Sequence, residues 1–190
     1  MASSSSSSSA TSPSASASAR PICISTKTDY LRNGDFESGA LLPVWTTTTQ
    51  TRLTPIVAQD ASLVHSGEWL QRALGTSASG AGSLAQYQTN IAIPDGKKVL
   101  INFWGQNLRA GFTSTFSIAL DGVELGRVSS SSGQWVQIGT GLVPYTVVGN
   151  THRLDITASS PAARTYLFHI DDVAIVDADP PLCGQPSIGT

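Results

Sequence analysis

Apolar and polar residues alternate through the middle of this chain with the two-residue period of a β-strand. Val99, Ile101 and Phe103 fall on one face of the first such run, and we expect that face to be buried. A second run, 115–120, alternates in the same way and ends at Asp121-Gly122, a dipeptide that favours a tight hairpin. No helical period of useful length accompanies these runs, so the chain is expected to fold from strands.

Short strand-like runs recur along the chain, separated by turns that contain Gly, Ser or Pro. We predict strands at 84–93, 99–106, 115–120, 123–128, 135–143, 152–158 and 166–176. Many short strands with this punctuation are typical of a sandwich. The length of 190 residues allows one domain with a sizeable core. We therefore predict an all-β fold, a two-sheet β-sandwich.

The start of the chain differs in composition from the rest. Residues 3–18 are almost only Ser, Ala and Thr and cannot bury enough surface to fold. We predict a disordered Ser/Ala-rich linker or stalk over 1–21, the β-sandwich over 22–184 and a flexible tail over 185–190. No apolar signal-peptide core is visible, so we expect a fragment of a longer secreted protein or an incomplete gene start. An organellar transit peptide ending at Arg20 is the alternative.

Charge is scarce in this chain. Only 13% of residues are charged, the formal net charge is −2, and there is no run of Lys or Arg. The electrostatic footprint of a nucleic-acid or anionic-membrane binder is therefore missing, and we expect neither nucleic-acid binding nor membrane insertion. We expect a monomer whose partners are uncharged, such as a polysaccharide or glycan.

Two acidic segments stand out against this background. Asn33 to Gly39 reads NGDFESG, and Phe168 to Ile175 reads FHIDDVAI, so each places carboxylates beside an apolar, strand-like run. Carboxylate oxygens are the ligands that calcium prefers. The two segments therefore favour a metal site.

The same two segments, with Trp45 after the first, resemble the signatures of CenC-type carbohydrate-binding modules. His65 to Leu70 resembles the strand opening of that family that contains Ser-Gly, and 88–104 resembles its QT…FW pair of strands. The resemblance spans 29–177. It implies a jelly-roll sandwich, attached in the family to cellulases, xylanases and related secreted proteins.

The resemblance also implies a structural calcium ion. Its side-chain ligands would be Glu37 and Asp171, joined by backbone carbonyls of Asp35, Ser66 and Trp69. Asp172 is a lesser candidate, because neighbouring residues of a regular strand point to opposite faces. The alternative is that both acids flank turns and are solvated.

Sugar recognition needs a flat aromatic ring and planar polar groups. Trp104 offers the ring and Asn102 and Gln106 the amides, all on one strand face. Tyr87 on a possible adjacent strand and Tyr166 on the last strand could extend this groove, and the further candidates are Gln86, Gln88 and Arg164. The alternative is that Trp104 closes one end of the core.

Two cysteines, Cys23 and Cys183, bracket the predicted domain. A disulfide between them would stabilise the fold by about 5 kcal/mol in the chain-entropy model. Two unpaired thiols are the alternative.

Catalytic signatures are missing from the sequence: there is no nucleophile elbow, no His-Glu-x-x-His and no phosphate-binding glycine loop. The three histidines are scattered and are expected in turns or on strand surfaces. We therefore predict a non-catalytic carbohydrate-binding module, extracellular or in a cell wall, that binds a neutral cell-wall or plant polysaccharide. A structural or adhesive surface domain and an accessory part of a glycoside hydrolase are the alternatives.

Overall fold

The structure is a computed structural model that describes residues 28–49, 53–76, 82–108, 112–160 and 165–178. Predictions for Cys23, Cys183, Arg164 and the two terminal segments lie outside these residues. Within the described ranges, no helix has the length and apolar character needed to cross a bilayer. The strands are β1 (Thr46–Thr49), β2 (Leu53–Gln59), β3 (Trp69–Thr76), β4 (Gly82–Ala92), β5 (Lys98–Asn107), β6 (Ser114–Leu120), β7 (Val123–Ser130), β8 (Val136–Gly139), β9 (Tyr145–Thr146), β10 (Thr151–Ser160) and β11 (Thr165–Asp177).

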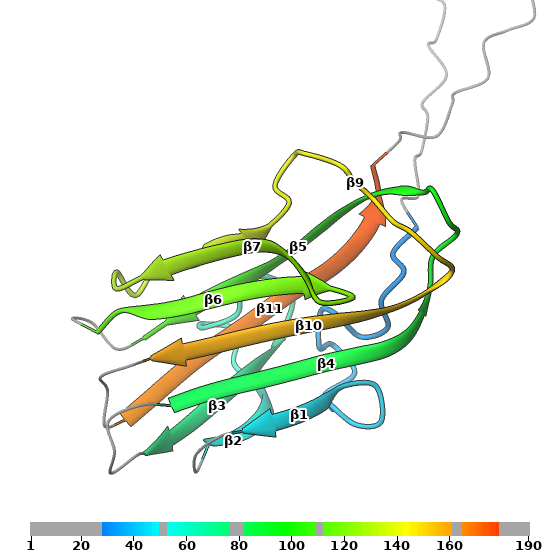
Figure 1. The fold of residues 1–190 in the computed structure, drawn as a ribbon. Coiled ribbons are helices and arrows are strands. Elements are labelled where there is room, and N and C mark those ends of the chain that lie inside the picture. The colour runs from blue at the N-terminus through cyan, green and yellow to red at the C-terminus, as the bar shows by residue number, and fades with distance from the viewer. Residues whose placement is uncertain (1–27, 50–52, 77–81, 109–111, 161–164, 179–190) are drawn as a thin grey trace, which may run out of the picture.

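These strands form two antiparallel sheets that pack face to face, as the two layers in Figure 1 show. The five-stranded sheet has the order β1-β4-β10-β6-β7, and the six-stranded sheet has the order β2-β3-β11-β5-β8 with β9 paired to β5. The predicted all-β sandwich is confirmed. β1 and β2 are the edge strands at one side of the two layers.

The predicted core face is confirmed as well. Val99, Ile101 and Phe103 are each 0% exposed, whereas the alternate residues of β5 are only half-buried. Phe103 packs edge-on against Phe116 of β6, with ring centroids 6.5 Å apart. Each large apolar side chain buried in this way contributes roughly 2 kcal/mol to the free energy of unfolding.

The hairpin predicted at Asp121-Gly122 joins β6 to β7, and both residues have positive φ, 50° and 81°. That conformation matches the turn type that fits strand twist. The strand predicted over 135–143 is shorter, because β8 ends at Gly139 and the chain then turns.

The two acidic segments lie side by side in the fold. Asp29 forms an isolated bridge with Val176 of β11, and the amide of Val173 donates to the carbonyl of Gly34 at 2.9 Å. The phenol of Tyr30 donates to Asp177 at 2.7 Å. Residues 29–34 therefore run along β11, and Glu37, Asp171 and Asp172 meet at the turn that leads into β3.

Candidate functional site

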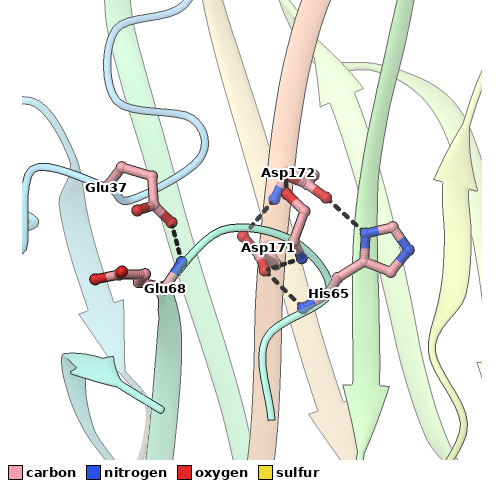
Figure 2. A network of polar contacts seen from close by, with 6 residues as sticks. Glu37, His65, Glu68, Asp171 and Asp172 are labelled. Carbon is pink, nitrogen blue, oxygen red and sulfur yellow. Dashed lines mark hydrogen bonds and ion pairs between the residues drawn. The ribbon is translucent and has the colours of Figure 1, made fainter. Parts of the chain in front are cut away.

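Carboxylates from β11 hold the turn 65–68, which leads into β3 (Figure 2). Oδ2 of Asp171 accepts the amide hydrogens of His65 at 2.8 Å and Ser66 at 3.3 Å. Oδ2 of Asp172 lies 2.6 Å from Nδ1 of His65, and its Oδ1 accepts the hydroxyl of Ser66 at 2.6 Å. We call residues 65–68 the carboxylate-held turn.

Both aspartates reach this turn because β11 is irregular where they lie. The pairing of β11 with β5 shifts register between Asp171 and Ala174, and Asp172 has φ of 49°. The expectation that the two side chains point to opposite faces assumed a regular strand. It is wrong here, since a bulge re-aims the side chain at its position.

Glu37 holds the other end of the turn. Its Oε1 accepts the amide hydrogens of Glu68 at 2.9 Å and Trp69 at 3.0 Å. Gly67 lies next to this carboxylate. A Cβ atom at Gly67 would be 2.1 Å from the same Oε1, and the φ of Gly67 is +66°. Gly67, the glycine of the Ser-Gly pair recognised in the sequence, is thus required by both backbone conformation and space.

Burial first, and then the charge of Asp172, raise the pKa of Asp171 to about 6, against the lowering effect of three backbone amides. The side chain is 0% exposed. A carboxylate in this position is stabilised by the amides rather than by water.

The two carboxylates of the predicted calcium set bond backbone amides in this geometry. Among the described residues no group of three or more Asp, Glu, His or Cys side chains is arranged to hold a metal. The bonded oxygens of Glu37 and Asp171 face amide hydrogens, whereas calcium takes six to eight oxygen ligands. The side chain of Asp35 accepts the amide of Glu37 at 3.3 Å and lines a separate hollow of about 190 Å³ together with Asp172. Calcium binding stays a prediction.

Trp104 lies on the outer face of the six-stranded sheet, as predicted, but its indole ring already contacts another side chain. The imidazole of His65 stacks on its indole, with centroids 4.0 Å apart and an interplanar angle of 16°. Trp135 meets the same imidazole edge-on at 5.6 Å. The carboxylate-held turn therefore covers one face of the ring expected to bind sugar.

The two amides beside Trp104 are engaged with neighbouring loops. Gln106 donates to the carbonyl of Gly133 at 2.9 Å, and its Oε1 lies 3.1 Å from Nδ1 of His169. Asn102 accepts the amide of Gly141 at 2.9 Å. These contacts support the six-stranded sheet, so the groups are not free to turn toward a ligand.

His169 is buried, at 0% exposure, where a surface position was expected. Its Nε2 accepts a hydrogen bond from Nε of Arg72 at 3.3 Å. Burial first, and then the charge of Arg72, lower its pKa to about 4. His152 is also buried and bonds Asp121 at 2.7 Å. Both histidines are fixed structural groups, because the strand faces they occupy are covered.

Tyr87 belongs to the other sheet. β4 and β5 follow each other in sequence, but the connection between them crosses from one layer to the other. Tyr87 therefore does not extend a groove with Trp104, as was expected from neighbouring strands. Tyr166 does lie in the six-stranded sheet, where it pairs with Gly75, and its side chain is outside the described residues.

The outer face of the five-stranded sheet is polar, and we call it the polar face. Tyr87 carries the guanidinium of Arg153 over its ring, 3.9 Å from the centroid, and Arg153 in turn donates to Asp155 at 2.6–3.0 Å. Ser117 and Thr157 bond each other at 2.6 Å on the next row. The register places on this face Thr46, Thr48, Tyr87, Thr115, Ser117, Glu124, Arg127, Ser129, Asp155, Thr157 and Ser159.

Arg153 and Asp155 were missed by the sequence-based search, although the run 151–160 contains the signal. Its alternation buries Leu154 and Ile156, which leaves Arg153 and Asp155 on the opposite, outward face. His65 was missed as a stacking partner because nothing local shows which strand a turn will cover.

No protein-family model matches the chain, and no curated protein matches it in sequence. The fold is nonetheless shared with solved structures. The carbohydrate-binding module TmCBM61, solved with β-1,4-galactotriose, is 21% identical over 79% of this chain and 99% of its own, with a TM-score of 0.55. The CBM22-1 xylan-binding domain of Xyn10C from Paenibacillus barcinonensis is 13% identical over 80% of this chain and 96% of its own, with a TM-score of 0.56.

A third structure is the C-terminal family 22 carbohydrate-binding module of Xyn10B from Clostridium thermocellum. It is 14% identical over 78% of this chain and 94% of its own, with a TM-score of 0.51. At these identities the likeness concerns the fold. The chain has the β-sandwich fold found in these carbohydrate-binding modules, and these three matches do not assign it to the CenC type.

Proposed function

We propose that this protein is a non-catalytic carbohydrate-binding module that binds a neutral polysaccharide across the polar face. The observation that carries the proposal is the group of Tyr87, Arg153 and Asp155 on a sheet face lined with hydroxyls. Support comes from the fold shared with carbohydrate-binding modules.

The polar face offers the groups that sugar recognition requires. An aromatic ring packs against the apolar face of a pyranose, while guanidinium, carboxylate and hydroxyl groups bond its edges. Arg153 and Asp155 fix each other, so they are ordered before a ligand arrives and lose less rotamer freedom on binding. The outer face of the other sheet is a weaker candidate, because its amides bond loop backbone and its aromatic ring carries His65, whereas the side chain of Arg153 on the polar face stays half exposed.

The proposal also covers where the protein acts and in what oligomeric state. A module of this kind acts outside the cell or in a wall, as a monomer, on its own or appended to a glycoside hydrolase. A structural or adhesive surface domain is the second candidate, favoured by the covered Trp104 alone.

Affinity electrophoresis of the full chain in gels containing xylan, mannan, galactan or β-glucan tests the proposal. We expect one polysaccharide to retard the protein, and Tyr87→Ala to weaken that interaction about tenfold, the size of a lost aromatic contact. Trp104→Ala is the matched control on the opposite sheet and should keep retardation.

Free migration of the folded protein in every gel would refute carbohydrate binding and favour the structural role. Loss of retardation in Trp104→Ala but not in Tyr87→Ala would move the site to the six-stranded sheet.

A further inference from the structure

Strand β4 carries an extra residue where it passes Arg153 of the polar face. The pairing of β10 with β4 shifts register at this point, between His152 and Leu154. Two residues of β4, Thr89 and Asn90, therefore oppose the single residue Arg153. A β-bulge of this kind interrupts the ladder and re-aims side chains, and bulges are frequent beside functional sites.

Both residues of the bulge face outward. They lie between Gln88 and Ile91, whose side chains point between the sheets and are 2% and 3% exposed. A regular strand has one outward residue between two inward ones, whereas β4 has two here, and both are exposed. Thr89 and Asn90 therefore project to the same side as Arg153, whose side chain is 50% exposed.

The backbone of Asn90 explains why an asparagine is tolerated at the bulge. Its φ is 57°, a left-handed conformation that asparagine adopts more readily than most residues with a side chain. Conformation alone would be a sufficient reason for this residue type if its amide also held the bulge together.

The amide of Asn90 does not do so. Three other polar residues with positive φ, namely Asn33, Asp121 and Asp172, each use the side chain in a hydrogen bond of 2.6–2.8 Å within the protein. In the part of the chain that the structure describes, the side-chain amide of Asn90 has no such partner. It is exposed beside Arg153 and is not needed to hold the fold.

The chemistry of this amide complements that of its neighbours. Arg153 can only donate hydrogen bonds and Asp155 can only accept them, whereas the amide of Asn90 offers two donors and an acceptor. A sugar hydroxyl also donates and accepts. The pairing of β1 with β4 covers residues 84–87 and stops short of the bulge, so β1 does not pair with the backbone there.

We propose that Asn90 is a further ligand-contacting residue of the polar face, and that the bulge places its amide to bond a sugar hydroxyl beside Arg153. This inference rests on the proposed function. It adds to that function a residue from outside the regular rows of the polar face.

Affinity electrophoresis of the full chain compares the unaltered protein with Asn90→Gly in gels of xylan, mannan, galactan and β-glucan. Glycine adopts positive φ without strain, so the bulge is kept and the amide is lost. We expect the polysaccharide that retards the unaltered protein to bind Asn90→Gly about tenfold more weakly, the size of a lost hydrogen-bonding group. The urea midpoint of Asn90→Gly should stay close to that of the unaltered protein.

Ala92→Gly is the matched control. Ala92 is exposed on β4, two residues beyond Asn90, and its side chain has no hydrogen-bonding group. The variant adds the same backbone freedom to the strand without removing a polar group. We expect it to be retarded as the unaltered protein is.

Equal retardation of Asn90→Gly and the unaltered protein would overturn the inference and leave the proposed function intact. So would equal weakening in Asn90→Gly and Ala92→Gly, because backbone freedom would then explain the loss. Free migration of the folded, unaltered protein in every gel would refute carbohydrate binding itself, and this inference with it.

Discussion

His169 and Asp171 lie two residues apart on β11, and acidification should shift the stability of the protein through them in opposite directions. Neutral His169 sits between Arg72 and Gln106, and burial with the Arg72 charge lowers its pKa from 6.5 to about 4. Between these values the unfolded chain binds more protons at this residue than the folded protein. The free energy of unfolding therefore falls as the pH falls through that window.

Asp171 behaves in the reverse sense. Burial and the Asp172 charge raise its pKa from 3.8 to about 6, so the folded protein binds more protons at this residue within that window. Its contribution to the free energy of unfolding grows as the pH falls. The pKa gap from 6.5 to about 4 for His169 and the gap from 3.8 to about 6 for Asp171 each correspond to about 3 kcal/mol.

Urea unfolding of the wild type, His169→Gln and Asp171→Asn from about pH 7 to about pH 4 measures both contributions. The stability advantage of the wild type over His169→Gln should shrink by about 3 kcal/mol on acidification. Its advantage over Asp171→Asn should grow by about the same amount. Parallel pH profiles for wild type and His169→Gln would show that His169 is not held neutral, and the reasoning from burial would fail.

Three further results are expected. Gly67→Ala should lower the free energy of unfolding by about 1–2 kcal/mol through backbone strain and the clash with Glu37, and the loss should be smaller in a Glu37→Ala background; equal losses in both backgrounds would exclude the clash. His65→Ala should remove the quenching contact with Trp104 and change tryptophan fluorescence without any glycan present; an unchanged spectrum would contradict the stack. If calcium is resident as the family resemblance predicts, a chelator should lower the melting temperature and added calcium restore it, whereas identical melting curves would show that amides alone hold the turn.

The strands of the sandwich could be predicted from the sequence because burial of one face imposes a period of two. The alternation around Phe103 and Phe116 and the turn at Asp121-Gly122 are local properties, and the structure agrees with them. The distribution of strands between layers is not local. Tyr87 and Trp104 lie on consecutive strands, yet their strands belong to different sheets, so the groove expected from their proximity in sequence does not form.

The candidate site shows the same limit. Glu37 and Asp171 could be picked out because acids are rare in this chain, but their partners could not. They bond the amides of a turn that is distant from both in sequence, and the bulge at Asp172 adds a second carboxylate. The apolar periodicity and the composition of the sequence cannot predict this bulge, because it arises only when β11 pairs with β5 in the folded protein.

The two outer faces of the sandwich therefore differ in how their polar and aromatic groups are engaged within the protein. On the six-stranded sheet, Trp104 and Gln106 are occupied by the carboxylate-held turn and by His169. Groups already bonded within the protein must break those bonds before they bind a ligand, which costs affinity. On the five-stranded sheet, Arg153 and Tyr87 order each other while facing outward. The side chain of Arg153 stays half exposed beside these partners, so a ligand can bond its outer edge while the pairs remain intact, and for that reason the polar face is the better place to look for a glycan.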